Sequence, residues 1–178
     1  MKIDWREKET NFRAELASKR NLRIVEMNAD GNCLFNAISH QIYGTQDFHQ
    51  LVREKCMEYI LAQKAYFQAF ITDEETIEQY CHRKSTLGVW GDDVEIQALS
   101  EIYDRSIEIM AYSSESLRTF HEQQTSNSAV TSLKLSYHGQ QHYNSVVDTR
   151  WTPAEALESG EPGAVENEAI EFVTQETS

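Results

Sequence analysis

The amino-acid sequence predicts an α+β domain, in which helices come first and a small, mostly antiparallel sheet follows, flanked by those helices. Two observations predict this class. Apolar residues recur mostly at helical spacing up to Tyr103, and from Ser106 onward they alternate as they do in strands. Apolar residues make up 40% of the 178 residues, which is enough for one domain with its own core.

Five helical segments are expected before the main sheet. They cover residues 4–19, 34–44, 45–60, 64–84 (in pieces) and 92–103. Gly44 is expected to end the second segment, because glycine readily adopts the left-handed conformation that closes a helix. Thr45 or Asp47 is expected to cap the third segment, and Asp92 or Asp93 the last, through side-chain oxygens.

The expected strands cover residues 22–27, 106–112, 133–137 and 142–147, with a hairpin turn at 138–141 between the last two. Residues 113–130 are rich in Ser, Thr, Gln and Asn and predict a long loop, which in a compact domain is more often functional than idle. We expect residues 1–150 to form one domain and residues 151–178 an acidic tail or linker, with a short helix near 169–173.

The net charge is −13, from 29 acidic and 16 basic residues. Nucleic acids and anionic membranes attract basic surfaces, so neither is expected as a partner. A basic protein partner fits better, although the charge serves solubility equally well. We find no apolar leader and no run of 18 apolar residues, so neither secretion nor a membrane span is expected.

The three cysteines, Cys33, Cys56 and Cys81, form no CxxC pair. They therefore predict neither a disulfide framework nor a cysteine-rich zinc site, and no cofactor or metal is expected. A reducing compartment, the cytoplasm or the nucleus, is the expected location. Cys56 and Cys81 fall on apolar helix stripes, where the expected role is to fill the core.

Cys33 stands where the turn through Asp30, Gly31 and Asn32 enters a helix. A lone cysteine most often fills a core. A thiol at a helix N-terminus, however, feels the positive end of the helix dipole, which lowers its pKa and favours a nucleophilic thiolate. Amides of the turn at Gly31 and Asn32 can also converge as an oxyanion hole, and Gly31 allows close approach.

A nucleophilic cysteine needs a base, and His142 is the best placed of the six histidines. His142 begins a predicted strand, where Asn144, two residues on, shares its face. Asn144 can accept the Nδ1 proton of His142, which leaves Nε2 facing the thiol. His138 is expected in the hairpin turn, where its position is poorly fixed. A polar strand face on the surface would give the same His-Tyr-Asn pattern.

Five motifs together resemble the OTU (ovarian tumour) cysteine proteases, in the family's order and spacing from about residue 5 to 148. They are Asp30-Gly-Asn-Cys33-Leu-Phe-Asn-Ala37, Tyr43-Gly44, Leu51-Val-Arg53, Trp90-Gly91 followed by Glu95 and Ala98-Leu99, and His142-Tyr-Asn-Ser-Val146. The OTUD subgroup is the most similar, on the stretches YGTQDFHQLVREKCMEYI and SYHGQQHYNSVV. The resemblance implies a papain-like OTU fold and a deubiquitinase.

The resemblance also implies roles for single residues. Cys33 matches the nucleophile and His142 the general base. Asp30 matches the aspartate that the family counts near its nucleophile, and Asn144 matches the polar residue that orients the histidine. The turn between Asp30 and Cys33 would supply the oxyanion-hole amides, and the motif at Trp90 is expected to scaffold the cleft.

The implied reaction is thiol-dependent hydrolysis of the peptide or isopeptide bond at the C-terminal glycine of ubiquitin. The implied partners are ubiquitin, polyubiquitin chains and ubiquitinated proteins, and the protein is expected to be a monomer. Two alternatives stay open: a module that binds ubiquitin without cutting it, and a deconjugase for another ubiquitin-like modifier. The intact set of Cys33, His142 and Asn144 argues against the first.

Overall fold

The computed structural model describes residues 4–121, 131–139 and 141–158. The helices are α1 (Trp5–Arg20), α2 (Cys33–Tyr43), α3 (His49–Ala62), α4 (Lys64–Phe67), α5 (Ile77–Lys84), α6 (Asp93–Ile102) and α7 (Pro153–Glu158), with short 3₁₀ turns η1 (Gln46–Phe48) and η2 (Gln68–Phe70). The strands are β1 (Leu22–Val25), β2 (Ile107–Met110), β3 (Arg118–Phe120), β4 (Leu133–His138) and β5 (His142–Asp148). Among the described helices, none is long and apolar enough to cross a bilayer.

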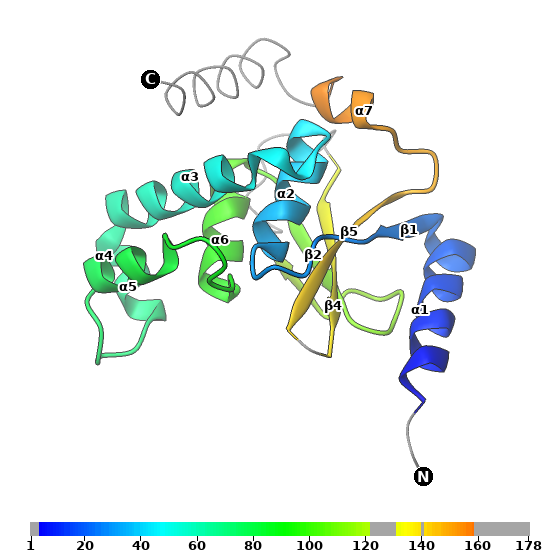
Figure 1. Cartoon of the computed structure of the whole chain (residues 1–178), viewed down its shortest axis with the longest axis horizontal. Helices are drawn as coiled ribbons and strands as arrows, with labels where there is room; N and C mark the ends of the chain where they lie inside the picture. The colour runs from blue at the N-terminus through cyan, green and yellow to red at the C-terminus, as the bar shows by residue number, and fades with distance from the viewer. Residues whose placement is uncertain (1–3, 122–130, 140, 159–178) are drawn as a thin grey trace.

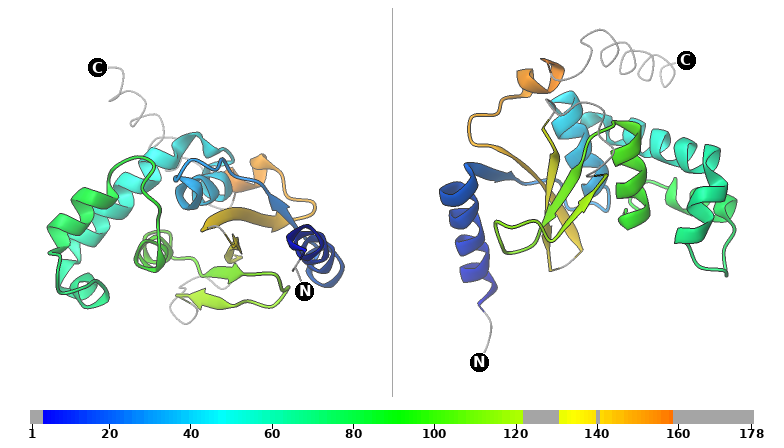
Figure 2. Two further views of the ribbon diagram at one scale, coloured as in Figure 1. Left: turned by 60° about the horizontal axis from the view of Figure 1, so that its bottom comes forward. Right: turned by 180° about the vertical axis from the view of Figure 1, so that it is seen from behind.

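The strands form one five-stranded sheet in the order β1-β5-β4-β2-β3. Only the β2–β4 pair is parallel, so the sheet is mostly antiparallel and the predicted α+β class is confirmed. Helices α2 to α6 lie on one side of the sheet and α1 on the other (Figures 1 and 2). The site described below forms where these two sides meet at the start of β5.

Local sequence signals account for the ends of several helices. Asp92 and Glu95 form a capping box at the start of α6, and Thr76 and Gln79 form another at α5. Gly44 ends α2 with a φ of 77°, which glycine adopts without strain. The predicted helix ends at Asp92 and Gly44 are therefore confirmed.

The larger core lies between the sheet and the helices from α2 to α6. On the other face, Phe12 and Leu16 of α1 are at most 1% exposed and pack with Leu22, Met110 and Val146. Each of these two buried side chains contributes about 1.5–3 kcal/mol to stability, enough to hold α1 firmly against the sheet.

The alternation of residues along β4 and β5 decides which side chains meet α1. Leu135 and Tyr143 belong to the larger core, whereas Val146 packs in the cluster with α1. Because neighbouring strand residues point to opposite faces, the even-numbered residues of β5, including His142 and Asn144, share the α1 side.

Three expectations differ from the structure. Residues 113–130 were expected to form a loop, but β3 lies within them and pairs with β2; residues 122–130 lie outside the described part. His138 was expected in a turn, but it is the last residue of β4 and pairs with His142. Residues 151–158 were expected to belong to a tail, but α7 packs against α2 and buries Ala156. The helix expected near 169–173 lies outside the described residues.

Candidate active site

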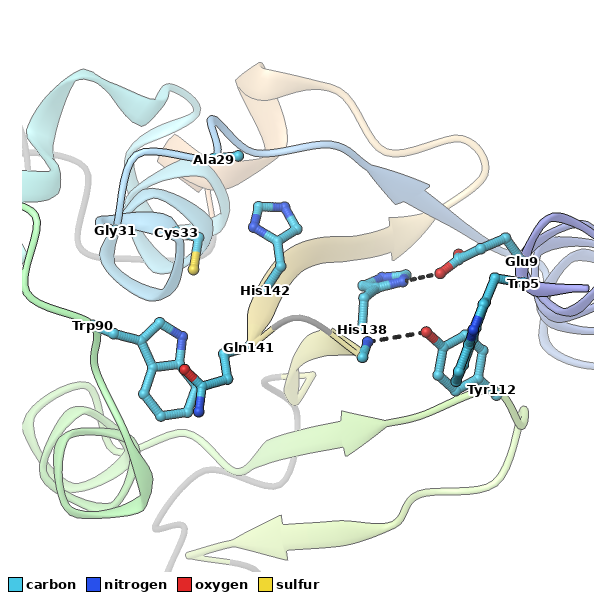
Figure 3. A pocket seen from close by; sticks show the side chains of 11 residues that line it. Trp5, Glu9, Ala29, Gly31, Cys33, Trp90, Tyr112, His138, Gln141 and His142 are labelled. Carbon is cyan, nitrogen blue, oxygen red and sulfur yellow. Dashed lines mark hydrogen bonds and ion pairs between the residues drawn. The ribbon is translucent and has the colours of Figure 1, made fainter. Parts of the chain in front are cut away.

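A cavity of about 850 Å³ lies between the N-terminus of α2, the ends of β4 and β5, and α1 (Figure 3). Three of the predicted site residues line it: Gly31, Cys33 and His142. Its lining consists of Trp5, Glu9, Ala29, Gly31, Cys33, Trp90, Tyr112, His138, Gly139, Gln141 and His142. The cleft therefore joins residues that are more than a hundred positions apart in the sequence.

Cys33 is the first residue of α2, and its side chain lies beside the imidazole of His142 (Figure 3). The Cys33 Sγ accepts a hydrogen bond from the backbone N–H of Tyr143 at 3.5 Å. The residue is only 2% exposed, and this burial raises the pKa of the thiol. The expected lowering of the pKa by the helix N-terminus is therefore wrong, because desolvation of the thiolate outweighs the backbone hydrogen bonds that favour it.

Asn144 holds the ring of His142 in one orientation. The Asn144 Oδ1 lies 2.8 Å from the His142 Nε2 and accepts the backbone N–H of Met27, also at 2.8 Å. Because the Met27 N–H can only donate, the side-chain atom that it meets is the oxygen, and the His142 Nε2 must carry a proton. The Nδ1 of a neutral His142 is then unprotonated, and this is the ring nitrogen that faces Cys33 in Figure 3.

The sequence had predicted the opposite pair of nitrogens, with Nδ1 on Asn144 and Nε2 toward the thiol. The structure corrects this: Nε2 contacts Asn144. The physical reason is that Asn144 lies two residues further along the same strand, so the ring nitrogen farther from the backbone, Nε2, reaches its amide. The nitrogen nearer the backbone, Nδ1, faces the N-terminus of α2. The partner predicted for the histidine is right, but the atom is wrong.

Asp30 shapes the turn before Cys33 and does not contact His142 in the described structure. Its Oδ1 accepts the backbone N–H of Asn32 at 3.0 Å and the Nδ2 of Asn36 at 3.3 Å. The carboxylate is exposed on the surface of the turn. It therefore acts on the loop that precedes the helix, as an N-cap side chain does.

Asn32 anchors this turn to the rest of the domain. Its Oδ1 accepts hydrogen bonds from the Arg53 Nη2 at 2.9 Å and from the backbone N–H of Gly88 at 2.8 Å. Since its own N–H is bound to Asp30, Asn32 does not supply the free oxyanion-hole amide that the sequence predicted. The N–H of Cys33 begins α2 and has no carbonyl partner within the helix, so it is the better donor.

Gly31 is required by the approach of another backbone segment. Its φ is 80°, and a Cβ added there would lie 2.0 Å from the carbonyl oxygen of Gly88. The close approach that the sequence predicted at Gly31 therefore involves the backbone at Gly88. This contact fixes the position of the turn beside the cleft.

Sequence reasoning assigned no site role to Arg53 or Glu9, took Trp90 as scaffold and left His138 in a turn. Arg53 is completely buried, and besides Asn32 it contacts the Lys84 carbonyl at 2.8 Å. Trp90 stacks on Tyr143 with ring centroids 5.6 Å apart and lines the cleft. Arg53 and Trp90 did carry a sequence signal, because they belong to the Leu-Val-Arg and Trp-Gly motifs. Glu9 and His138 carried none.

The two other cysteines lie away from the cleft. Cys56 is completely buried and its thiol donates to the carbonyl of Glu95, while burial raises the pKa of Cys81 to about 11. In the part of the chain that the structure describes, no group of three His, Cys, Asp or Glu side chains is arranged to hold a metal ion.

Comparison with protein families matches residues 28–145 to the OTU-like cysteine proteases. The chain is 40% identical over 142 residues to OVARIAN TUMOR DOMAIN-containing deubiquitinating enzyme 6 of Arabidopsis thaliana, covering 80% of this chain and 27% of that protein. It is 37% identical over 142 residues to OTU domain-containing protein 5 of Homo sapiens, covering 77% and 24%. The chain thus spans about a quarter of the length of these curated relatives.

Solved structures give the same fold. The OTU domain of OTUD1 superposes with a TM-score of 0.66 at 25% identity, covering 80% of this chain and 93% of that one. An OTU domain solved in complex with ubiquitin superposes with a TM-score of 0.60 at 19% identity, covering 83% and 84%.

Proposed function

Because the chain belongs to the OTU-like cysteine protease family, we propose that it is a deubiquitinase that hydrolyses the bond at the C-terminal glycine of ubiquitin. The observation that carries the proposal is that Cys33 and His142 face one cleft, while Asn144 holds the His142 ring. The name of the Arabidopsis relative and the OTU domain solved with ubiquitin support ubiquitin as the substrate.

The reaction follows from the protonation states that the hydrogen bonds require. The unprotonated Nδ1 of His142 takes the Cys33 proton as the sulfur attacks the carbonyl carbon of the terminal glycine. The negative oxygen that forms accepts a hydrogen bond from the Cys33 N–H. His142 then protonates the departing lysine amine as the carbon–nitrogen bond breaks. Water, deprotonated by the same Nδ1, then attacks the thioester carbon. The carbon–sulfur bond breaks, ubiquitin leaves with a free C-terminal carboxylate, and His142 returns the proton to the Cys33 sulfur.

In this scheme the Cys33 thiol passes its proton to His142 only as the reaction begins. Burial raises the pKa of Cys33, so the thiolate forms as the substrate is attacked. Asn144 carries no charge and so fixes the orientation of His142 without adding the stabilisation of an imidazolium that a carboxylate gives.

The shape of the cleft supports a substrate that ends in glycines. Cys33 is almost fully covered, and the indole of Trp90 lies across the cavity from His142 (Figure 3). A chain that ends in two glycines, as ubiquitin does, has no side chains to exclude from such a site. The net charge of −13 suits the arginines of the ubiquitin tail. We propose ubiquitin, polyubiquitin chains and ubiquitinated proteins as partners, and a monomeric enzyme.

Hydrolysis of ubiquitin carrying a C-terminal fluorogenic amide tests the proposal. We expect turnover that Cys33→Ala abolishes and that Cys56→Ala, a matched change at a buried cysteine outside the cleft, retains. Ubiquitin-like modifiers with the same fluorogenic group are measured in parallel. Binding of ubiquitin without turnover, or faster turnover of another modifier, contradicts the proposal and favours the binding module or the deconjugase instead.

A further inference from the structure

A second histidine lies directly behind the residue that orients His142. His138 is the last residue of β4 and pairs with His142 in the register of the sheet, while Ser136 pairs with Asn144. The side chain of His138 is 11% exposed. All four side chains fall at even-numbered positions of the two strands, on the face that α1 covers.

The hydrogen bonds of His138 require one tautomer. With the Asn144 Oδ1 fixed by Met27, its Nδ2 points the other way and lies 3.3 Å from the His138 Nε2. An amide Nδ2 can only donate, so the His138 Nε2 must accept. The hydroxyl of Ser136 lies 2.8 Å from the same nitrogen and can donate to it as well.

The proton of this neutral His138 is therefore on Nδ1, and Glu9 meets it there. The Glu9 Oε1 lies 2.7 Å from the His138 Nδ1, as the dashed line in Figure 3 shows. Glu9 comes from α1, which Phe12 and Leu16 hold against the sheet. A continuous row of hydrogen bonds thus runs from the carboxylate of Glu9 through His138 and Asn144 to His142.

We propose that His138 and Glu9 are positioning residues of this enzyme, which fix the amide of Asn144 and so hold the base His142 in the tautomer that can deprotonate Cys33. Each link depends on the donor and acceptor roles of the next, since Glu9 selects the Nδ1–H form of His138. That form presents a lone pair to Asn144, whose oxygen then faces His142. The inference rests on the proposed function, because it assigns the proton acceptor of the same reaction.

Other charged or titratable groups face this row and have to be considered in any pH dependence. Glu9 and His142 flank His138, and the ring of Tyr112 lies 6.0 Å from it by centroid. Lys8 lies 5.7 Å from the centre of the Tyr112 ring. A cavity of about 620 Å³ on this side is also lined by Arg6, Arg13 and Glu26.

Protonation of His138 would place a second donor against the Asn144 Nδ2. The amide cannot turn over to relieve this contact, because its oxygen already accepts from Met27 and His142. A proton on the His138 Nε2 is therefore incompatible with the hydrogen bond from Asn144 that holds His142.

Two substitutions at one position separate positioning from folding. His138→Phe keeps the ring against Phe12 and Tyr112 but removes both nitrogens. His138→Gln carries a side-chain oxygen that can accept from Asn144. The matched control is His121→Phe, since His121 is also a buried imidazole paired with a carboxylate, at 2.9 Å from Asp104, but it follows the far edge strand β3.

The measurements are kcat and KM on fluorogenic ubiquitin and the rate at which iodoacetamide alkylates Cys33, both as a function of pH, together with the melting temperature. We expect His138→Phe to lower kcat by roughly 3- to 10-fold, the value of one hydrogen bond of typical strength, with little change in KM. We also expect it to alter the pH dependence of Cys33 alkylation. His138→Gln should restore most of kcat, and His121→Phe should leave kcat, KM and the alkylation profile unchanged.

Alkylation needs no ubiquitin, so it reports on the row even if hydrolysis of ubiquitin is absent. An unchanged alkylation profile in His138→Phe overturns the inference, as does an equal loss of kcat in the Gln variant. If His138→Phe fails to fold, Glu9→Ala and Glu9→Gln give the same contrast at a position whose side chain is 31% exposed. In that pair, Ala should slow catalysis and Gln, which still accepts from His138, should not; equal rates in the two variants refute the proposal.

Discussion

Replacing Asn144 by alanine should cost both stability and activity, because one amide serves the fold and the base together. The residue is 4% exposed, and its oxygen is the acceptor for the backbone N–H of Met27, which is itself 5% exposed. Without the amide, that N–H is left unpaired in the interior. The ring of His142 also loses the contact that holds its Nε2.

The magnitude follows from the unpaired donor. A buried polar group without a partner costs about 1–3 kcal/mol, which for a domain of this size corresponds to a melting temperature roughly 2–12 °C lower. Catalysis should fall by less than the roughly 10²- to 10⁴-fold that a positioned base supplies, because His142 is still present but is free to turn.

Asn144→Asp is the matched variant. Its carboxylate keeps the acceptor for Met27 and His142, but a second oxygen now faces the lone pair of the His138 Nε2. That contact becomes favourable only when His138 takes up a proton there. We therefore expect Asn144→Asp to melt near the wild-type temperature. Its activity, expressed as a fraction of the wild-type activity at the same pH, should be highest at acidic pH.

Thermal unfolding and kcat/KM between pH 5 and 9 on fluorogenic ubiquitin measure both effects; this range of about four pH units brackets the ordinary histidine pKa. A melting temperature of Asn144→Ala within about 1 °C of the wild type would show that Met27 is satisfied in another way. An unchanged pH profile in both variants would refute the reasoning about His142.

Three further outcomes are expected. Asp30→Ala should lower the melting temperature and kcat without shifting the pH profile, since Asp30 bonds its own turn; the pH shift of the Asn144 variants appearing here would make Asp30 the orienting residue. Because burial raises the pKa of Cys33, its alkylation by iodoacetamide should increase with pH through a midpoint above that of free cysteine, and a midpoint below that value would indicate an ion pair in the resting state. Deletion of residues 159–178 should leave hydrolysis unchanged, whereas deletion of 153–178 should lower the melting temperature by removing α7; a folded but inactive shorter variant would place the deleted segment in the site.

Much of the fold could be predicted because its signals are local. The capping residues at Asp92 and the glycine at Gly44 lie in the sequence beside the helix ends that they determine. The strand β3 could not be predicted in the same way. It is a short segment, Arg118–Phe120, inside a polar stretch, and it is a strand because it pairs with β2.

The same distinction between local and distant signals applies to the site. Cys33, His142 and Asn144 carried a sequence signal, whereas the atoms that they use depend on distant contacts. The backbone N–H of Met27 and the His138 ring both contact the Asn144 amide, and burial of Cys33 by the rest of the domain raises the pKa of its thiol despite the helix N-terminus. Neither effect is encoded within a few residues of the motif.

Covalent capture by ubiquitin that carries a C-terminal electrophile tests the central claim most directly. We predict one adduct per enzyme molecule, mapped by mass spectrometry to Cys33, absent in Cys33→Ala and formed more slowly in His142→Ala. Adducts at Cys56 or Cys81, or no adduct with the folded protein, would contradict the account.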